Sequence, residues 1–255
     1  MGFKDDIKSY LHNKVYFIPT KSNYFLRVLI VNLEHLRLAR SLYYQFFGNL
    51  FVFSKQNLDS LHRCLGVMKE NSFDEELLDS FDLLLQNSQK NLELFFKEYE
   101  DLFLSLKNAI PITFSYIEEG FENSKALLCV REILSKSILR RNEVKFKESE
   151  DNIGFCFLLM SEFLKQKEDD LAKELFQKLI HQNIDEFIKF IFEHKKAYLY
   201  KEVAKILATF IEFERSCFNL SKVSKTTSKK VQNDLSRSEF LRRETNKKRR
   251  VNAKS

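Results

Sequence analysis

Three carboxylates gather near the middle of the chain, at Glu148, Glu150 and Asp151. Paired carboxyl groups work as acid and base in glycoside hydrolases, where polar and aromatic groups shape a cleft around them. Here they stand at the end of the charged segment 140–150, which has no sustained periodicity and predicts a loop between two helices. One interpretation is a solvated loop in which Asp151 caps the next helix. The other is that the carboxylates receive a cationic partner peptide.

Motifs of the common enzyme classes do not occur in the sequence. It contains no Gly-rich phosphate loop, no C-x-x-C, no H-E-x-x-H and no G-x-S-x-G. The histidines never stand three or four residues from one another or from a cysteine, so no single helix presents a metal-binding pair. These histidines are His12, His35, His62, His181 and His194. We therefore expect no metal, no cofactor and no catalytic residue, and an enzyme built on the three carboxylates is the least favoured hypothesis.

The cysteines and the N-terminus bear on the cellular compartment. The four cysteines are widely separated in apolar helical contexts, which indicates reduced, buried thiols: Cys64, Cys129, Cys156 and Cys217. Four charges fall in the first ten residues and no apolar run follows them, so we expect no secretory signal. No window approaches the roughly 18 to 20 apolar residues of a membrane span. The sequence predicts a cytoplasmic protein.

Glycine and proline are scarce in this chain. There are five glycines and two prolines among 255 residues, against a background of roughly 12 % for the two together. Hairpins and nucleotide-binding βα loops need these residues for their turns. Hydrophobic residues make up 44 % of the chain and charged residues 31 %, which is typical of a globular protein. The composition predicts an all-α fold.

Apolar residues recur at steps of three and four along most of the first 220 residues. They predict about nine or ten helices with short connections, over residues 24–53, 58–68, 73–85, 91–106, 113–139, 151–164, 169–180, 184–192 and 198–213. Ser72, with Glu75 three residues on, has the pattern of an N-terminal cap. Pro111 breaks the chain, and Gly120 marks an interruption in the fifth helix. We expect one globular helical domain over residues 1–220.

The end of the chain differs from the rest in charge. From Ser221 onward there are twelve basic and three acidic residues, a net of +9. Subtracting them from the totals of 42 and 36 leaves 30 basic and 33 acidic residues, a net of −3, for residues 1–220. Because the segment is rich in Ser, Thr, Asn and Lys, we predict a basic, largely disordered tail over 221–255. A helical protein bound to nucleic acid or the ribosome through this tail is the runner-up function.

Several segments resemble, in order, the motifs of a known family. Residues 148–153 (ESEDNI) are similar to the signature E-P-x-D-H-I, and the apolar helix that follows also matches. Further similarities fall in residues 39–43 (ARSLY), 98–103 (EYEDLF), 115–116 (SY), 130–132 (VRE) and 198–214, the closing helix. Over about residues 24–215 the chain resembles the TorD/DmsD/NarJ family of cytoplasmic chaperones for molybdenum-containing respiratory oxidoreductases.

The resemblance implies a TorD-like all-α fold and a chaperone that is not an enzyme. Such a chaperone binds the twin-arginine signal peptide of a partner enzyme, holds the precursor until its cofactor is inserted, and then releases it for export. Arginine forms charge-assisted, often bidentate bonds with carboxylates, and the apolar part of a signal peptide needs a groove between helices. We expect Glu148, Glu150 and Asp151 to bind the arginines, Asn152 and Tyr116 to make polar contacts at the mouth, and Phe155 and Phe187 to form apolar walls. The alternative for the two phenylalanines is the core, where a Phe at helical spacing usually lies.

The chain departs from the family pattern at three positions. Ser149 replaces the signature proline, Asn152 replaces its histidine, and Phe187 stands where a tryptophan is common. Asn does not titrate near neutrality, which argues against a pH-dependent role. Formate dehydrogenase is the first expected client, because divergent Lys- and Phe-rich members of the family resemble accessory proteins for that enzyme. Nitrate, trimethylamine oxide and sulfoxide reductases remain open, as do a monomer and a homodimer.

The basic tail contains a segment similar to the twin-arginine consensus itself. Residues 236–242 (SRSEFLR) resemble S-R-R-x-F-L-K, with Ser238 in place of the second arginine. We hypothesise that the tail is a weak pseudo-substrate that occupies the protein's own groove or a neighbour's. The residues that would carry this contact are Ser236, Arg237, Phe240, Leu241 and Arg242. The alternative is a solvated basic end with a chance match.

Overall fold

The computed structural model describes residues 23–222, apart from 53–60, 73, 91 and 145. Within these residues every regular secondary-structure element is a helix. Strand-like pairing is limited to one isolated antiparallel bridge between Thr113 and Asn152. The all-α prediction is therefore confirmed. None of the described helices combines the length and the apolar character needed to cross a membrane.

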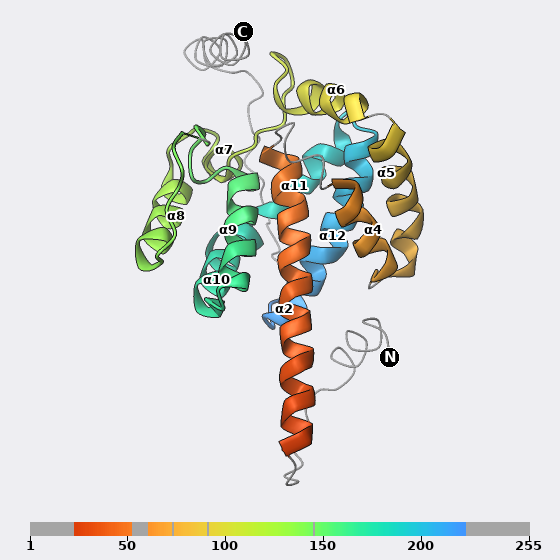
Figure 1. Cartoon of the computed structure of the whole chain (residues 1–255). Coiled ribbons are helices and arrows are strands. Elements are labelled where there is room, and N and C mark those ends of the chain that lie inside the picture. The colour runs from red at the N-terminus through yellow and green to blue at the C-terminus, as the bar shows by residue number, and fades with distance from the viewer. Residues whose placement is uncertain (1–22, 53–60, 73, 91, 145, 223–255) are drawn as a thin grey trace.

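Helix α2 (Asn23–Val52) runs through the centre of the molecule, and its first turns extend beyond the other helices (Figure 1). Its closest neighbour is α9 (Ile153–Lys165), which lies against its C-terminal half. Two glycines make this crossing close. A Cβ atom added to Gly154 would lie 2.6 Å from the backbone nitrogen of Val52, and one on Gly48 would lie 2.7 Å from Cγ of Leu158. The two helices are therefore in near backbone contact.

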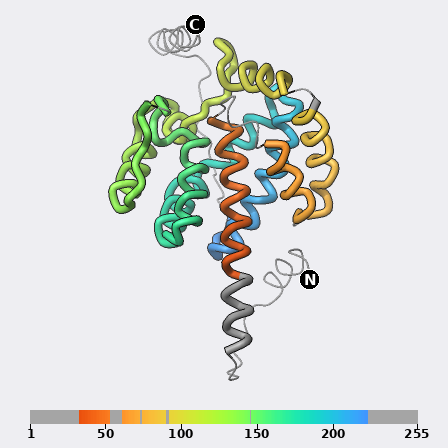
Figure 2. Tube along the Cα trace, viewed as in Figure 1, coloured from red at the N-terminus to blue at the C-terminus, as the bar shows by residue number. Residues whose placement is uncertain are grey.

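The other helices form two groups on either side of α2, and Figure 2 follows the chain from one group to the other. The first group contains α4 (Leu61–Glu70), the 3-10 turn η1 (Glu75–Leu77), α5 (Leu78–Lys90) and α6 (Leu92–Phe103). The second contains α7 (Phe114–Glu119), α8 (Lys125–Lys136) and α10 (Asp169–Leu175). A π-helical turn (Phe176–Ile180) leads into α11 (His181–Glu193), and α12 (Leu199–Cys217) ends the described part.

Some predicted helix boundaries agree with the structure and others do not. Gly120 ends α7 with a left-handed φ of 79°, so the predicted interruption is confirmed. Ser72 is not a helix cap, since the side chain of Asp74 accepts from the N–H of Glu76 and caps η1 instead. The predicted break after residue 180 is also wrong.

The helix continues from residue 169 to 193 because its polar residues there find partners inside the protein. At the π turn, the N–H of His181 donates to the carbonyl of Phe176. The His181 ring accepts at Nδ1 from Nε of Arg215 (3.3 Å), and the amide of Asn183 donates to the carbonyl of Leu179 (3.1 Å). Two polar residues of this run, His181 and Asn183, are therefore buried and hydrogen-bonded.

Buried ionic contacts anchor α12 to the first half of the chain. The carboxylate of Glu98 accepts from the backbone N–H groups of Tyr198 (2.7 Å), Leu199 (2.9 Å) and Tyr200 (2.8 Å) at the start of α12. Near its other end, the fully buried Glu214 forms a two-bond pair with Arg40 of α2, at 2.6 and 2.8 Å. Burial alone would lower the pKa of Arg40, but the Glu214 carboxylate outweighs it and raises that pKa.

The cysteines of the described part are all free. Cys156 is buried, whereas Cys64, Cys129 and Cys217 are only half-buried, so the prediction of buried thiols holds fully for one of the four. Burial raises the pKa of each thiol, and raises that of Cys217 to about 12. A thiol is a poor nucleophile when its pKa is high, because little thiolate forms near neutral pH.

Candidate functional site

The predicted loop between α8 and α9 is present, and it ends beside the start of α7. The N–H of Phe114 donates to the carbonyl of Asp151 (3.0 Å), and the N–H of Ile153 donates to the carbonyl of Ile112 (2.9 Å). This short bridge places the N-termini of α7 and α9 next to each other. Because both helix ends carry partial positive charge, the point where they meet favours an anion.

Asp151 is the anion at that point, and it is almost fully buried, with 1 % of its surface exposed. Its Oδ2 accepts from the N–H of Ser115 in the first turn of α7 (2.9 Å), and its Oδ1 accepts from the hydroxyl of Ser149 (2.5 Å). Asp151 therefore caps α7 and not the helix that follows it in sequence. That helix, α9, is capped by Asn152, whose Oδ1 accepts from the N–H of Phe155 (3.2 Å).

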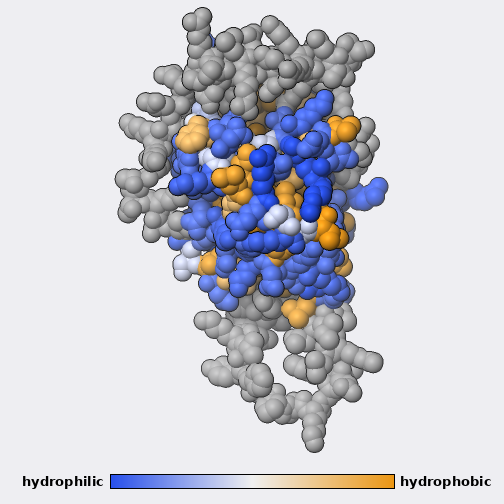
Figure 3. Space-filling view, turned by 90° about the vertical axis from the view of Figure 1, so that its left-hand side faces the viewer, coloured by the Kyte–Doolittle hydropathy of each residue, from blue (hydrophilic) through white to orange (hydrophobic). Residues whose placement is uncertain are grey.

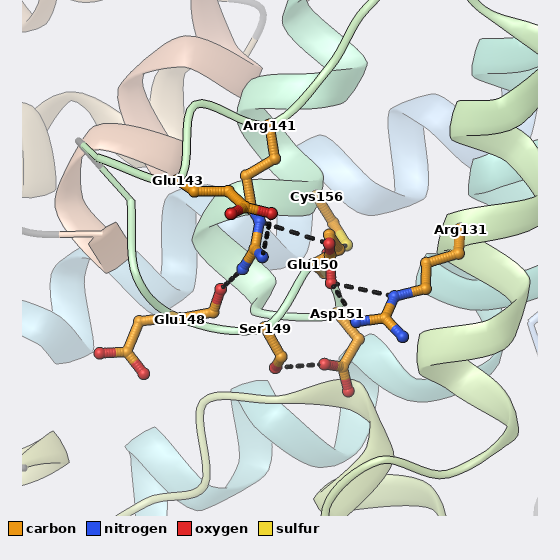
Figure 4. A network of polar contacts seen from close by, with 8 residues as sticks. All are labelled: Arg131, Arg141, Glu143, Glu148, Ser149, Glu150, Asp151 and Cys156. Carbon is orange, nitrogen blue, oxygen red and sulfur yellow. Dashed lines mark hydrogen bonds and ion pairs between the residues drawn. The ribbon is translucent and has the colours of Figure 1, made fainter.

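Glu150 lies between two arginines of the same chain (Figure 4). Its Oε2 accepts from Nε (3.3 Å) and Nη2 (3.2 Å) of Arg131, which belongs to α8. Its Oε1 lies 3.3 Å from Nε of Arg141, in the loop. The Glu150 side chain is 12 % exposed, and each of its oxygens faces one guanidinium. The side chain of Glu148 points away from this pair in the same view.

The two arginines differ in how firmly they are held. The Arg141 side chain is 18 % exposed, donates to the backbone carbonyl of Glu148 and lies 3.3 Å from Glu143. Its Nε is buried and has no hydrogen-bond acceptor among the described residues, despite its distance to Glu150. The Arg131 side chain is 55 % exposed. The loop thus presents one carboxylate that binds guanidinium groups, with one fixed and one exposed arginine.

Apolar side chains adjoin this polar cluster. Phe155, in the first turn of α9, is half-buried and stacks on Phe146 of the loop with ring centroids 5.1 Å apart. Ile138 and Val144 are more than four-fifths exposed. Figure 3, which views the α8 side, shows hydrophobic residues in separate groups among hydrophilic ones. Phe146 was not among the expected site residues, although an apolar residue in a charged loop is a signal that sequence alone provides.

The remaining expected residues lie inside the protein. Phe187 of α11 is fully buried and packs edge-on against Phe51, with ring centroids 5.0 Å apart. It therefore forms core and no accessible wall. Tyr116 and Asn152 are 6 % and 3 % exposed. The pseudo-substrate segment falls outside the described residues: Ser236, Arg237, Phe240, Leu241 and Arg242.

A separate cavity of about 260 Å³ lies between α2, α10 and the end of α12. Leu33, Ala172 and Phe218 are among the residues that line it, together with Arg37 and other polar groups. Its charged groups are paired within the protein, with Nη2 of Arg37 2.7 Å from Oδ2 of Asp169. No group of three or more His, Cys, Asp or Glu side chains in the described part is placed to hold a metal ion.

Comparison with known proteins gives the class to which this chain belongs. The family model described as nitrate reductase delta subunit matches residues 69–203, which is more than half of the chain. Among solved structures the chain is similar to a candidate redox enzyme maturation protein from Archaeoglobus fulgidus. That likeness has a TM-score of 0.43 and 20 % identity, and covers 80 % of this chain and 99 % of the other. No curated protein sequence matches this chain.

The match to the family model places the chain among the redox enzyme maturation chaperones. The chain belongs to the nitrate reductase delta subunit family, which is the TorD/DmsD/NarJ group that its motifs resemble. Members of this family are chaperones and not enzymes, and their partner is the precursor of a redox enzyme.

Proposed function

We propose that this chaperone binds the twin-arginine signal peptide of a molybdenum-containing respiratory oxidoreductase and holds the precursor in the cytoplasm until its cofactor is inserted. Formate dehydrogenase is the first proposed client, because this Lys- and Phe-rich chain resembles divergent members of the family that look like accessory proteins for that enzyme. One observation carries the proposal. Glu150, near the surface at the signature loop, already pairs with guanidinium groups at both of its oxygens: Oε2 accepts hydrogen bonds from Arg131, and Oε1 lies 3.3 Å from Nε of Arg141.

The physical argument starts from the ligand's two arginines. A guanidinium is planar and donates two parallel hydrogen bonds to a carboxylate, which makes it the preferred cation at such a site. Glu150 is buried enough to escape full solvent screening, and its partner Arg131 is exposed enough to move. Glu148, in the same loop, is half-buried and supplies a second carboxylate for the other arginine.

The apolar part of the peptide needs contacts of a different kind. Phe146 and Phe155 form a stacked, half-buried pair next to the loop, and the exposed Val144 lies two residues before Phe146. We assign the apolar contact to these residues in place of Phe187. Asp151, Asn152 and Tyr116 keep a place in the proposal as residues that hold the loop and the two helix ends in position.

Calorimetric titration with synthetic signal peptides tests this function. The panel contains twin-arginine peptides from formate dehydrogenase and from nitrate, trimethylamine oxide and sulfoxide reductases, each with an Arg-to-Lys control. We expect micromolar binding to one peptide and at least about a tenfold loss in Glu150→Gln, since a lost charged hydrogen bond costs about 1.5–3 kcal/mol. The peptide that binds also names the client.

Glu143 gives a matched control within the same loop. Its side chain is 80 % exposed, so Glu143→Gln removes the same charge from the surface and should change the affinity little. Equal losses in the two variants would mean that the peptide responds only to the net charge of the loop. Absence of binding to every peptide, also after removal of residues 223–255, would contradict the proposal. The basic tail and a salt-dependent contact with nucleic acid would then be the next hypothesis.

A further inference from the structure

We infer that Arg131 is an internal occupant of the guanidinium site at Glu150, and that an arginine of a bound peptide takes its place. The inference rests on the proposed function for the identity of the peptide. The exchange itself is a property of three side chains of this chain: Glu150, Arg131 and Arg141. Through this exchange, Arg131 influences how tightly the site binds a peptide, although Arg131 does not contact Glu150 once the peptide is bound.

Geometry distinguishes the exchangeable arginine from the fixed one. Arg141 is four-fifths buried and bonded to the backbone carbonyl of Glu148, so it stays with the loop. Arg131 projects from α8 with more than half of its side chain in solvent, and its contacts with Glu150 measure 3.2 and 3.3 Å. These are long compared with the roughly 2.7–2.9 Å of a strong charged hydrogen bond. Because these contacts are long and the side chain of Arg131 is more than half exposed to water, Arg131 can leave Glu150 at a lower cost than the mostly buried Arg141.

Electrostatics favours replacement over addition. A third guanidinium beside Glu150 would place three positive charges around a single carboxylate, and like charges at these distances repel. Arg131 can relieve this repulsion by swinging into water, a movement that Arg141 cannot make. The vacated oxygen, Oε2, can then accept hydrogen bonds from an arginine of the peptide.

The neighbouring carboxylates do not offer the same site. Both oxygens of Asp151 are engaged, by the N–H of Ser115 and the hydroxyl of Ser149, and the residue is 1 % exposed. Glu143 is 80 % exposed, so water and salt screen its charge. Only Glu150, among the carboxylates drawn in Figure 4, combines a sheltered position with an arginine that can depart.

The test uses the full chain with diarginine amide as the probe, titrated at low ionic strength and followed by NMR or calorimetry. We expect Arg131→Gln to bind diarginine amide about two- to fivefold more tightly than the native protein, the factor that corresponds to an exposed ion pair. Lys136→Gln removes the same charge from the same helix, but Lys136 pairs with Glu132 and Glu174 and not with Glu150. It should show little gain. Arg131→Gln combined with Glu150→Gln should lose the gain.

The outcomes separate this inference from the proposed function. Unchanged or weaker diarginine binding in Arg131→Gln would overturn the exchange, whatever the signal peptides do. An equal gain in Lys136→Gln would also overturn it, since only net charge would then matter. If diarginine amide binds more tightly to Arg131→Gln while no signal peptide binds any variant, the exchange stands and the proposed client class is wrong.

Discussion

Glu98 shows how a single side chain can hold a distant helix in place. It stands on α6 in the segment EYEDLF, and it accepts three backbone N–H groups at the first turn of α12, about 100 residues further along the chain. A negative charge at a helix N-terminus is favourable both for its hydrogen bonds and for its interaction with the helix dipole. The contact gives a physical reason for an acidic residue at this position of the motif.

Glu98→Gln should lower the free energy of unfolding by about 1–3 kcal/mol, because an amide oxygen replaces two carboxylate oxygens that are buried and bonded. Urea unfolding followed by circular dichroism measures this change. Glu100→Gln is the control, since Glu100 is exposed on the same helix and should shift the free energy by less than about 0.5 kcal/mol. Similar values for the two variants would show that the cap contributes nothing specific.

His181 makes the stability of the folded protein depend on pH. Burial lowers its pKa below the usual value of 6.5, and the neighbouring Arg215 lowers it further, while Asp185 and Glu212 act in the opposite direction. The unfolded chain therefore binds a proton more readily than the folded protein. Stability should be highest with His181 neutral and should fall as the pH drops below 6.5 and toward the lower folded value.

His181→Asn tests this dependence, because its side-chain oxygen can still accept from Arg215 but does not titrate. We expect the midpoint of urea unfolding to change less between pH 7.5 and 5 in the variant than in the native protein. His35 is an exposed histidine on α2, and His35→Asn should keep the native slope. An identical pH dependence in all three proteins would rule out His181 as its source.

Residue types in the sequence located the acidic loop but not the partners of its charges. Arg131 stands 19 residues before Glu150, on another element, and only the packing of α8 against the loop brings them together. The sequence likewise could not show that Asp151 faces the start of α7. For Phe187 both a surface and a core role were consistent with helical spacing. Its packing against the buried Phe51 shows that it belongs to the core.

At the scale of elements, the crossing of α2 and α9 depends on glycine. Gly154→Ala would bring a Cβ within 2.6 to 2.8 Å of the α2 backbone at Phe51 and Val52, where no flexible side chain can yield. The two helices would have to separate, and overpacking of this kind costs about 1–3 kcal/mol or more. We expect a clear fall in the thermal midpoint, measured by circular dichroism.

Gly66 provides the opposite case. It lies inside α4, and a Cβ there would meet nothing within 4 Å. Gly66→Ala should therefore stabilise the protein by about 0.5–1 kcal/mol, the gain of alanine over glycine in a helix interior. If both substitutions raised the midpoint, backbone propensity and not the helix crossing would explain the effect at Gly154.

Helical periodicity predicted most of the elements but not all of their ends. The apolar steps identified α2, α6, α9 and α12 closely, since these helices bury one continuous face. The π turn before His181 was missed, because its polar residues are satisfied by α12 and by the preceding turn of their own helix, and neither contact is visible in a one-dimensional pattern.

At the scale of the whole molecule, charge is divided between the body and the tail. Residues 1–220 carry a net −3 and the remainder +9. Opposite charges on one chain attract at low ionic strength, and the attraction is screened within about 10 Å at 0.1 M salt. The proposed peptide site is a carboxylate that binds guanidinium groups. The tail segment SRSEFLR contains arginines of the kind that this site would bind in a signal peptide.

Removal of residues 223–255 should therefore strengthen binding of a twin-arginine peptide if the tail competes for Glu150. With an effective concentration of about 1 mM for the tethered tail and a similar dissociation constant for its contact, the gain would be about twofold, and more for a tighter contact. Competition at Glu150 also requires that the gain disappear in Glu150→Gln and shrink as salt is raised.

A full-length variant with Arg237 and Arg242 changed to Gln should behave like the truncated protein, because it removes the guanidinium groups while keeping the tail's length. Equal affinity in the truncated and full-length proteins at low salt would mean that the tail does not enter the site.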